Sequence, residues 1–185
     1  MTLMIAGLVL FLGVHLIPMM PRLRARLTAR IGENRYRGLF AAISALGLLL
    51  IIAGYRMRPE RVQLFEPWPA VRAAAPLLVT IAFVLFAAAN MKSHIRRSLR
   101  HPMLIGLLLW SGVHLLANGD PTGTILFGSF FVYAIADLIS ATRRGAVKSF
   151  EPVWTHDAIA IAAGVGLAYL TTRFHPALFG TGAVA

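Results

Sequence analysis

The sequence predicts an all-α integral membrane protein, a polytopic bundle of about six transmembrane helices. Apolar residues make up 58% of the 185 residues and charged residues only 14%, and the mean hydropathy is +0.72. A soluble core of this size cannot enclose so much apolar surface. The apolar residues also gather in runs of about 20, the length that a helix needs to cross a bilayer.

Six such runs account for most of the chain. Pro18 and Pro21 follow the first run, and Pro76 lies early in the third. Gly119 after Asn118 supplies a left-handed helix stop, and Asp120 before a proline supplies an N-cap, so the fourth and fifth helices should form a tight antiparallel hairpin. The runs lie near residues 2–20, 38–55, 74–91, 102–117, 122–141 and 155–172.

The basic residues predict the orientation, because cytoplasmic connections collect Lys and Arg. Three alternate connections hold thirteen of the eighteen Lys and Arg residues, which places both termini outside. These thirteen are Arg22, Arg24, Arg26, Arg30, Arg35, Arg37, Lys92, Arg96, Arg97, Arg100, Arg143, Arg144 and Lys148. The opposite side has the aromatic, proline-rich loop 59–69, which we interpret as an interfacial anchor.

Composition and motifs also exclude several classes of protein. The net charge of +11 would suit nucleic acid in a soluble chain, but here the basic residues flank apolar runs and meet anionic lipid, so we expect the bilayer as a partner and no nucleic acid. The chain has no cysteine, so it has no thiolate ligand. It also lacks the usual hydrolase and phosphate-loop motifs, and no soluble domain fits between the runs.

Two histidines inside apolar runs are the main candidates for chemistry. His114 follows Trp110 by four residues and Gly106 by eight, so the three share one helical face. His15 repeats this pattern with Phe11 and Gly7. An imidazole in hydrocarbon needs a partner, and each glycine would let a flat group such as a porphyrin edge approach. The alternative is an imidazole hydrogen-bonded to a neighbouring helix.

The other polar residues have simpler interpretations. His101 precedes Pro102 at a helix start, where capping is at least as good an explanation as metal ligation. His94 follows Asn90 by four residues, and we interpret it as a solvated boundary histidine. Asp137 should pair with a nearby arginine.

Two intramembrane imidazoles and an arginine-rich inner side are the ligand set of a b-type haem, whose propionates favour arginine. We therefore expect haem b, with His15 and His114 as metal ligands and Trp110, Arg22 and Arg100 as further cofactor-binding residues. At about 1.5 Å per residue, the two histidines are offset in depth by more than about 10 Å in upright helices. Helix tilt, a break of the first helix at Pro18 or a different span boundary would close that gap; if none does, His94 or His101 is the alternate partner of His15.

The chain resembles the NnrU family over most of its length. The motifs that carry the resemblance are Gly13-Val14-His15-Leu16-Ile17-Pro18, the following Pro21-Arg22-Leu23-Arg24, His101-Pro102, and Trp110-Ser111-Gly112-Val113-His114-Leu115-Leu116-Ala117-Asn118-Gly119-Asp120. The resemblance implies one transmembrane domain over residues 1–185 in the bacterial inner membrane. It also implies a role in supporting nitrite and nitric oxide reduction in denitrification, through redox or nitric oxide chemistry at the iron.

The family is related to the plant 15-cis-zeta-carotene isomerase, an integral membrane haem b enzyme. By that resemblance, His15 and His114 match the two histidines implicated in haem ligation there. The isomerase has a cysteine where this chain has Ser111, so a ligand exchange through that cysteine is impossible here. The resemblance leaves open whether this chain is an enzyme. If it is one, it is a haem-dependent isomerase of a carotenoid-like polyene or an oxidoreductase.

Two further alternatives remain. Arg100-His101-Pro102 with Gly106 resembles a segment of small membrane methyltransferases that helps to hold S-adenosylmethionine. The later acidic and arginine-containing region that those enzymes need is weak here, so we expect no such cofactor. The chain can also be interpreted as a non-enzymatic assembly partner of a membrane reductase complex.

Overall fold

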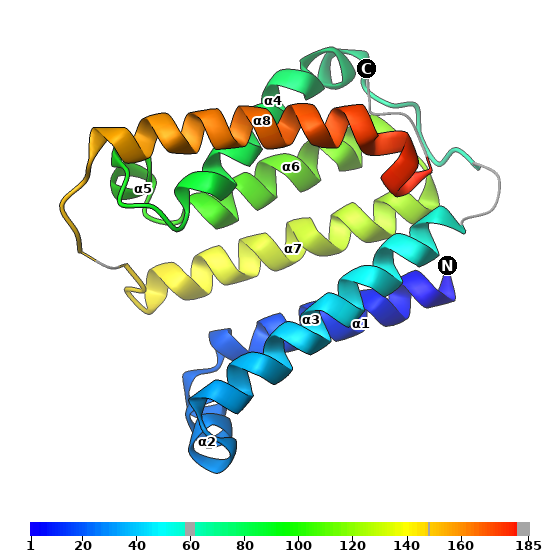
Figure 1. The fold of residues 1–185 in the computed structure, drawn as a ribbon. Helices are drawn as coiled ribbons and strands as arrows, with labels where there is room; N and C mark the ends of the chain where they lie inside the picture. The colour runs from blue at the N-terminus through cyan, green and yellow to red at the C-terminus, as the bar shows by residue number, and fades with distance from the viewer. Residues whose placement is uncertain (58–61, 148, 181–185) are drawn as a thin grey trace. The chain divides into compact units, whose positions relative to one another are not determined.

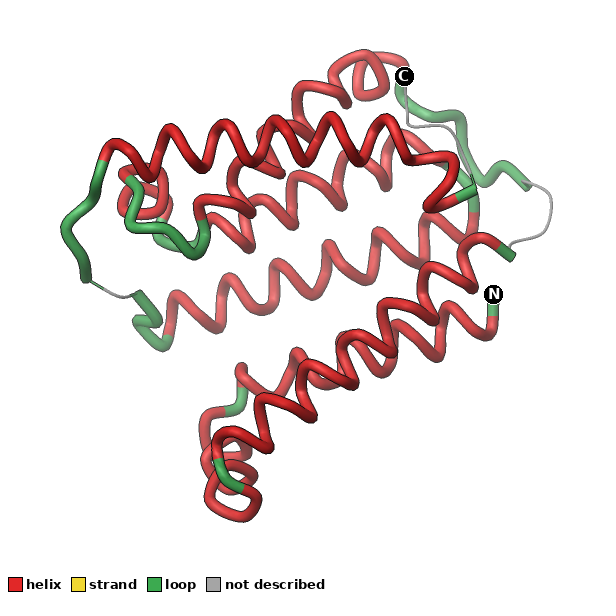
Figure 2. The backbone as a smooth tube through the Cα atoms, in the orientation of Figure 1, coloured by secondary structure: helices red, strands yellow, loops and turns green. Residues whose placement is uncertain are grey.

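The computed structural model describes residues 1–57, 62–147 and 149–180. Over these residues the chain is helical and contains no strand (Figures 1 and 2). The elements are α1 (Thr2–Leu16), the 3-10 helix η1 (Ile17–Met19), α2 (Pro21–Ile31), α3 (Glu33–Arg56), α4 (Pro69–Ala88), α5 (His94–Leu99), α6 (Pro102–Asn118), α7 (Pro121–Arg143) and α8 (Trp154–Phe179). The chain divides into two compact units, Met1–Glu60 and Arg61–Ala185.

The all-α prediction is confirmed for the described residues, and the chain is a membrane protein by the length and hydropathy of its helices. Four segments are long and apolar enough to cross a bilayer: Thr2–Met19, α3, α4 and α7. Helix α6 is apolar but has only 17 residues. Helix α8 is not among the four, since polar and charged residues flank its apolar stretch 158–172. The six spans and the outside placement of both termini stay predictions.

The first unit is built on close packing between α1 and α3 (Figure 1). A Cβ atom on Gly7 would lie 2.6 Å from the backbone nitrogen of Ile51 and 2.7 Å from the carbonyl oxygen of Gly47. Gly47 meets the backbone of Phe11 in turn. Small residues allow helices to approach at backbone distance in a membrane, where van der Waals packing holds them together. The two glycines therefore fix the separation of the two helices.

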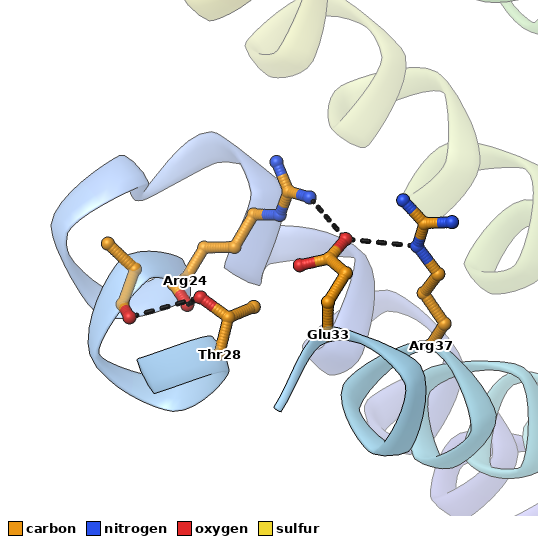
Figure 3. Close-up of polar contacts among 5 residues, drawn as sticks. Arg24, Thr28, Glu33 and Arg37 are labelled. Atoms are coloured by element: carbon orange, nitrogen blue, oxygen red, sulfur yellow. Dashed lines mark hydrogen bonds and ion pairs between the residues drawn. The ribbon is translucent and has the colours of Figure 1, made fainter. Parts of the chain in front are cut away.

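Helix α2 lies where the pattern of apolar runs predicts only a connection. It starts at Pro21, and its Arg24 guanidinium lies 3.1 Å from the Glu33 carboxylate at the start of α3. Arg37 donates to the same carboxylate oxygen at 2.9 Å (Figure 3). The hydroxyl of Thr28 donates to the carbonyl of Arg24 within α2. One carboxylate thus ties α2 to α3.

In the second unit, α4 packs against both α6 and α8, and α6 packs against α7. Helix α4 begins at Pro69, so Pro76 lies inside it and not near its start as predicted. It also ends at Ala88, before the predicted boundary. The chain turns there and starts the separate helix α5 at His94, so Asn90 and His94 do not share a helical face.

The predicted hairpin between α6 and α7 is confirmed. Gly119 takes a left-handed conformation with φ of +72° after α6, and the Asp120 carboxylate accepts the N–H of Gly123 at 2.8 Å as the N-cap of α7. The N–H of Leu64 donates to the Gly119 carbonyl at 2.8 Å. This hydrogen bond holds the loop that precedes α4 against the α6–α7 hairpin. Part of the predicted interfacial loop 59–69, together with Lys148 from the orientation count, lies outside the described residues.

Candidate functional site

His15 occupies the last turn of α1 in the first unit. Its Nδ1 lies 2.6 Å from the carbonyl oxygen of Phe11, four residues earlier. The Phe11 ring stacks on the imidazole with centroids 4.2 Å apart and planes 24° apart. Phe40 of α3 approaches the imidazole at 4.9 Å. Two aromatic rings and one backbone carbonyl therefore fix the position of this half-buried imidazole.

His114 repeats this arrangement in the second unit. Its Nδ1 lies 2.7 Å from the carbonyl oxygen of Trp110, again four residues earlier, and the two rings are 4.9 Å apart. Phe127 of α7 lies 4.7 Å from the imidazole. Trp110 packs edge-on against Phe127 and Phe130 at 5.2 and 5.8 Å. The aromatic residues of α7 hold the imidazole as Phe40 does in the first unit.

The hydrogen bonds assign the tautomer of both imidazoles. A carbonyl oxygen only accepts, so the Nδ1 atoms of His15 and His114 must carry the proton and donate. In a neutral imidazole the lone pair then belongs to Nε2. This is the tautomer that ligates iron through Nε2 while the other nitrogen is held by a backbone carbonyl.

The predicted role of the two glycines is wrong. A Cβ atom on Gly106 would meet the Ala82 carbonyl oxygen and the Phe86 ring of α4, both at 3.0 Å. Gly7 is likewise covered by α3, as described above. The glycines accommodate neighbouring helices of their own units, and in neither unit do they leave a gap for a porphyrin edge.

His94, one alternate ligand, makes structural contacts that the sequence did not suggest. Its Nδ1 lies 2.7 Å from the Asp157 carboxylate of α8, and its ring stacks on Trp154 with centroids 3.8 Å apart. The same carboxylate accepts the backbone N–H groups of His94 and Ile95, each at 3.0 Å. The interpretation of His94 as a solvated boundary residue is therefore wrong, because it joins α5 to α8.

His101, the other alternate, occupies the N-cap position of α6, but its side chain makes no cap hydrogen bond. Its carbonyl accepts the N–H groups of Leu104 and Ile105 instead. Its Nε2 is buried and has no hydrogen-bond partner among the described residues.

The predicted pairing of Asp137 is confirmed, since Arg144 lies 3.6 Å from its carboxylate and Tyr133 donates to it at 3.1 Å.

The two predicted propionate partners differ in their surroundings. Arg22 is exposed in the first turn of α2. Arg100 lines a cavity of about 430 Å³ between α5 and the connection from α7 to α8.

The sequence did not reveal the contacts of Phe40, Phe127 and Asp157, because each residue comes from a distant segment and no local spacing marks it.

The fold and these side chains define a helical membrane protein with an oriented imidazole in each of its two units. No group of three or more His, Cys, Asp or Glu residues suited to a metal ion occurs among the described residues. A family model described as NnrU protein matches residues 3–183. The chain therefore belongs to the NnrU family, and the match spans both units. Comparison with curated proteins and with solved structures gives no match.

Proposed function

We propose that this chain binds haem b in the membrane through His15 and His114 and supports the reduction of nitrite or nitric oxide. The observation that supports haem binding is the repeated geometry of the two histidines. Each donates from Nδ1 to the carbonyl of an aromatic residue four positions earlier, at 2.6 Å for His15 and 2.7 Å for His114. Such a bond fixes the ring and raises the basicity of the ligating nitrogen.

Two histidines are enough protein ligands for a haem. A porphyrin brings four nitrogen atoms of its own, so the protein needs only one or two axial side chains. Two half-buried histidines with Nε2 as the basic nitrogen satisfy this need without a larger cluster of ligands. Aromatic rings beside both imidazoles add the apolar surroundings that a macrocycle prefers.

The remaining residues would position the ligands and balance charge. Phe11 and Trp110 hold the imidazole rings through their carbonyls and ring faces, and Arg22 and Arg100 would pair with propionates. When bound, the haem would supply one-electron redox chemistry and an iron that binds small gases. The link to nitrite and nitric oxide rests on membership of the NnrU family.

The first experiment is an absorption spectrum of the detergent-purified protein from haem-supplied cells. We expect a haem b spectrum that is lost in His15→Ala and His114→Ala. His156→Ala is the matched control, because that imidazole accepts the backbone N–H of Lys92 at 3.0 Å. His94→Ala and His101→Ala test the alternate ligands. A colourless folded protein, or haem retained by both of the first two variants, contradicts the proposal.

A second experiment tests the functional part separately. The purified protein is reduced with dithionite and titrated with nitric oxide while its absorption spectrum is followed. A saturable shift of the haem bands supports chemistry at the iron. A haem-loaded protein whose spectrum does not change contradicts a role in nitric oxide chemistry but leaves haem binding standing.

A further inference from the structure

Three arginines line a cavity in the second unit. Arg96 and Arg97 come from α5, Arg100 follows it, and the other wall is the connection from α7 to α8, including Phe150 and Glu151. Figure 1 shows α5 and this connection at the same end of the unit. The cavity has a volume of about 430 Å³, within the range of about 300–1,000 Å³ for small-molecule pockets.

The cavity has an excess of positive charge. The described residues that line it include three arginines and one acidic residue, Glu151. That carboxylate, on Glu151, is 3.8 Å from Arg97, and its side chain is 97% exposed. An exposed ion pair at this distance stabilises little. Glu151 therefore leaves most of the positive charge available to an anion.

Contacts of its side chain fix the position of Arg96, whereas a tight backbone turn fixes the position of Arg100. The Arg96 guanidinium lies 5.1 Å from the centre of the Phe150 ring and donates to the Met91 carbonyl at 3.4 Å. Arg100 has φ of +61° and ψ of −48°, and the N–H of His101 donates to the Leu99 carbonyl at 2.6 Å around it. This is a γ-turn of the rare, strained type. A non-glycine residue in such a conformation suggests a functional requirement for its side chain.

The position of the cavity suggests the source of the anion. It lies where α5 joins the end of α4 to the start of α6, beside the connection that follows α7. The ends of apolar helices lie at the level of lipid headgroups in a bilayer. Arginine clusters at that level bind anionic headgroups, and the planar guanidinium matches phosphate oxygens in pairs.

We propose that Arg96, Arg97 and Arg100 form a binding site for a phosphate group, supplied by an anionic lipid headgroup or by free phosphate. The volume leaves room for more than a phosphate ion, as a glycerol phosphate headgroup requires. The site shares Arg100 with the proposed haem contacts, whereas Arg96 and Arg97 belong to the phosphate site alone. Haem absorbance is measured in parallel, so that loss of haem and loss of phosphate binding are separate results.

The test uses the full chain with two probes. In detergent, binding of inorganic phosphate is measured by equilibrium dialysis at fixed ionic strength. In nanodiscs, association of spin-labelled phosphatidylglycerol is compared with that of spin-labelled phosphatidylcholine. We expect Arg97→Gln/Arg100→Gln to weaken phosphate-group binding by about tenfold or more, because charge-assisted hydrogen bonds are lost. Glu151→Gln should tighten it, because the competing carboxylate is removed.

The matched control is Arg35→Gln/Arg143→Gln, which removes the same charge from exposed residues on the same predicted side, outside the cavity. Arginine-dependent binding of phosphatidylglycerol alone supports the proposal with lipid as the source, and arginine-dependent binding of inorganic phosphate alone supports it with free phosphate as the source. Binding of neither probe, or equal weakening in the control variant, overturns it. Circular dichroism checks the fold, and Arg100→Gly provides a second variant that removes the side chain without backbone strain.

Discussion

The Nδ1–H of His114 donates to the carbonyl oxygen of Trp110 at 2.7 Å, and their rings lie 4.9 Å apart. The same relationship joins His15 to Phe11 at 2.6 Å in the other unit. Because each Nδ1 donates a proton to a carbonyl oxygen, the lone pair of each neutral imidazole belongs to Nε2. The two units thus present the same histidine tautomer in the same local geometry.

Trp110 should matter for the stability of the second unit as well as for the orientation of His114. Trp110→Leu removes two edge-on ring contacts, to Phe127 and Phe130, each worth about 0.5–1.5 kcal/mol. We expect a lower thermal unfolding midpoint in detergent. Trp68→Leu is the control, because Trp68 is 58% exposed. Equal midpoints for the two variants would show that the aromatic contacts do not stabilise α6 against α7.

The packing of α1 on α3 predicts opposite effects for two glycines in the same helix. Gly7→Ala places a Cβ atom 2.6 Å from the backbone nitrogen of Ile51, and overpacking of this kind costs about 1–3 kcal/mol. Gly13→Ala meets nothing within 4 Å and should stabilise the helix by about 0.5–1 kcal/mol. Unfolding in detergent followed by circular dichroism measures both. A stabilising Gly7→Ala would show that the helices are not in close contact there.

The link between α5 and α8 depends on the Asp157 carboxylate, which accepts three N–H groups from α5. Asp157→Asn leaves a weaker acceptor and should expose the amides of α5 to faster hydrogen exchange. Glu151→Gln is the control, since that carboxylate is almost fully exposed. Unchanged protection of α5 in Asp157→Asn would contradict this role.

Arg100 should destabilise the protein by its backbone conformation. Residues in sparsely populated φ/ψ regions cost about 1–3 kcal/mol each, and glycine adopts positive φ readily. We expect Arg100→Gly to raise the unfolding midpoint, with Arg97→Gly as the comparison, because Arg97 lies inside α5 and glycine destabilises a helix there. A lower midpoint for Arg100→Gly would show that the side chain stabilises the turn.

The sequence predicted the helices that apolar runs and local end signals encode, and missed α2 and α5. Gly119 and Asp120 mark the α6–α7 hairpin because a left-handed stop and an N-cap are local devices. Helix α2 was missed because a search for apolar runs does not detect a helix with four arginines. Helix α5 was missed because Asp157, which accepts its first N–H groups, is 62 and 63 residues away in the chain.

Of the ring contacts around the two histidines, the sequence predicted those within one helix and missed those between helices. Spacing by four placed Phe11 beside His15 and Trp110 beside His114, which is a property of any helix. The glycines on the same faces pack against other helices, because an apolar helix does not reveal in its sequence which side meets a neighbour. Phe40 and Phe127 come from neighbouring helices and could be found only in the structure.

We propose that His15 and His114 ligate haem iron, and imidazole rescue tests this ligation most directly. Electron paramagnetic resonance of the ferric protein should give a low-spin signal. In His15→Gly and in His114→Gly that signal should be lost, with the iron becoming high-spin or the haem dissociating, and added imidazole should restore it by filling the vacated position. A low-spin signal that persists in both variants and does not respond to imidazole would contradict ligation by His15 and His114.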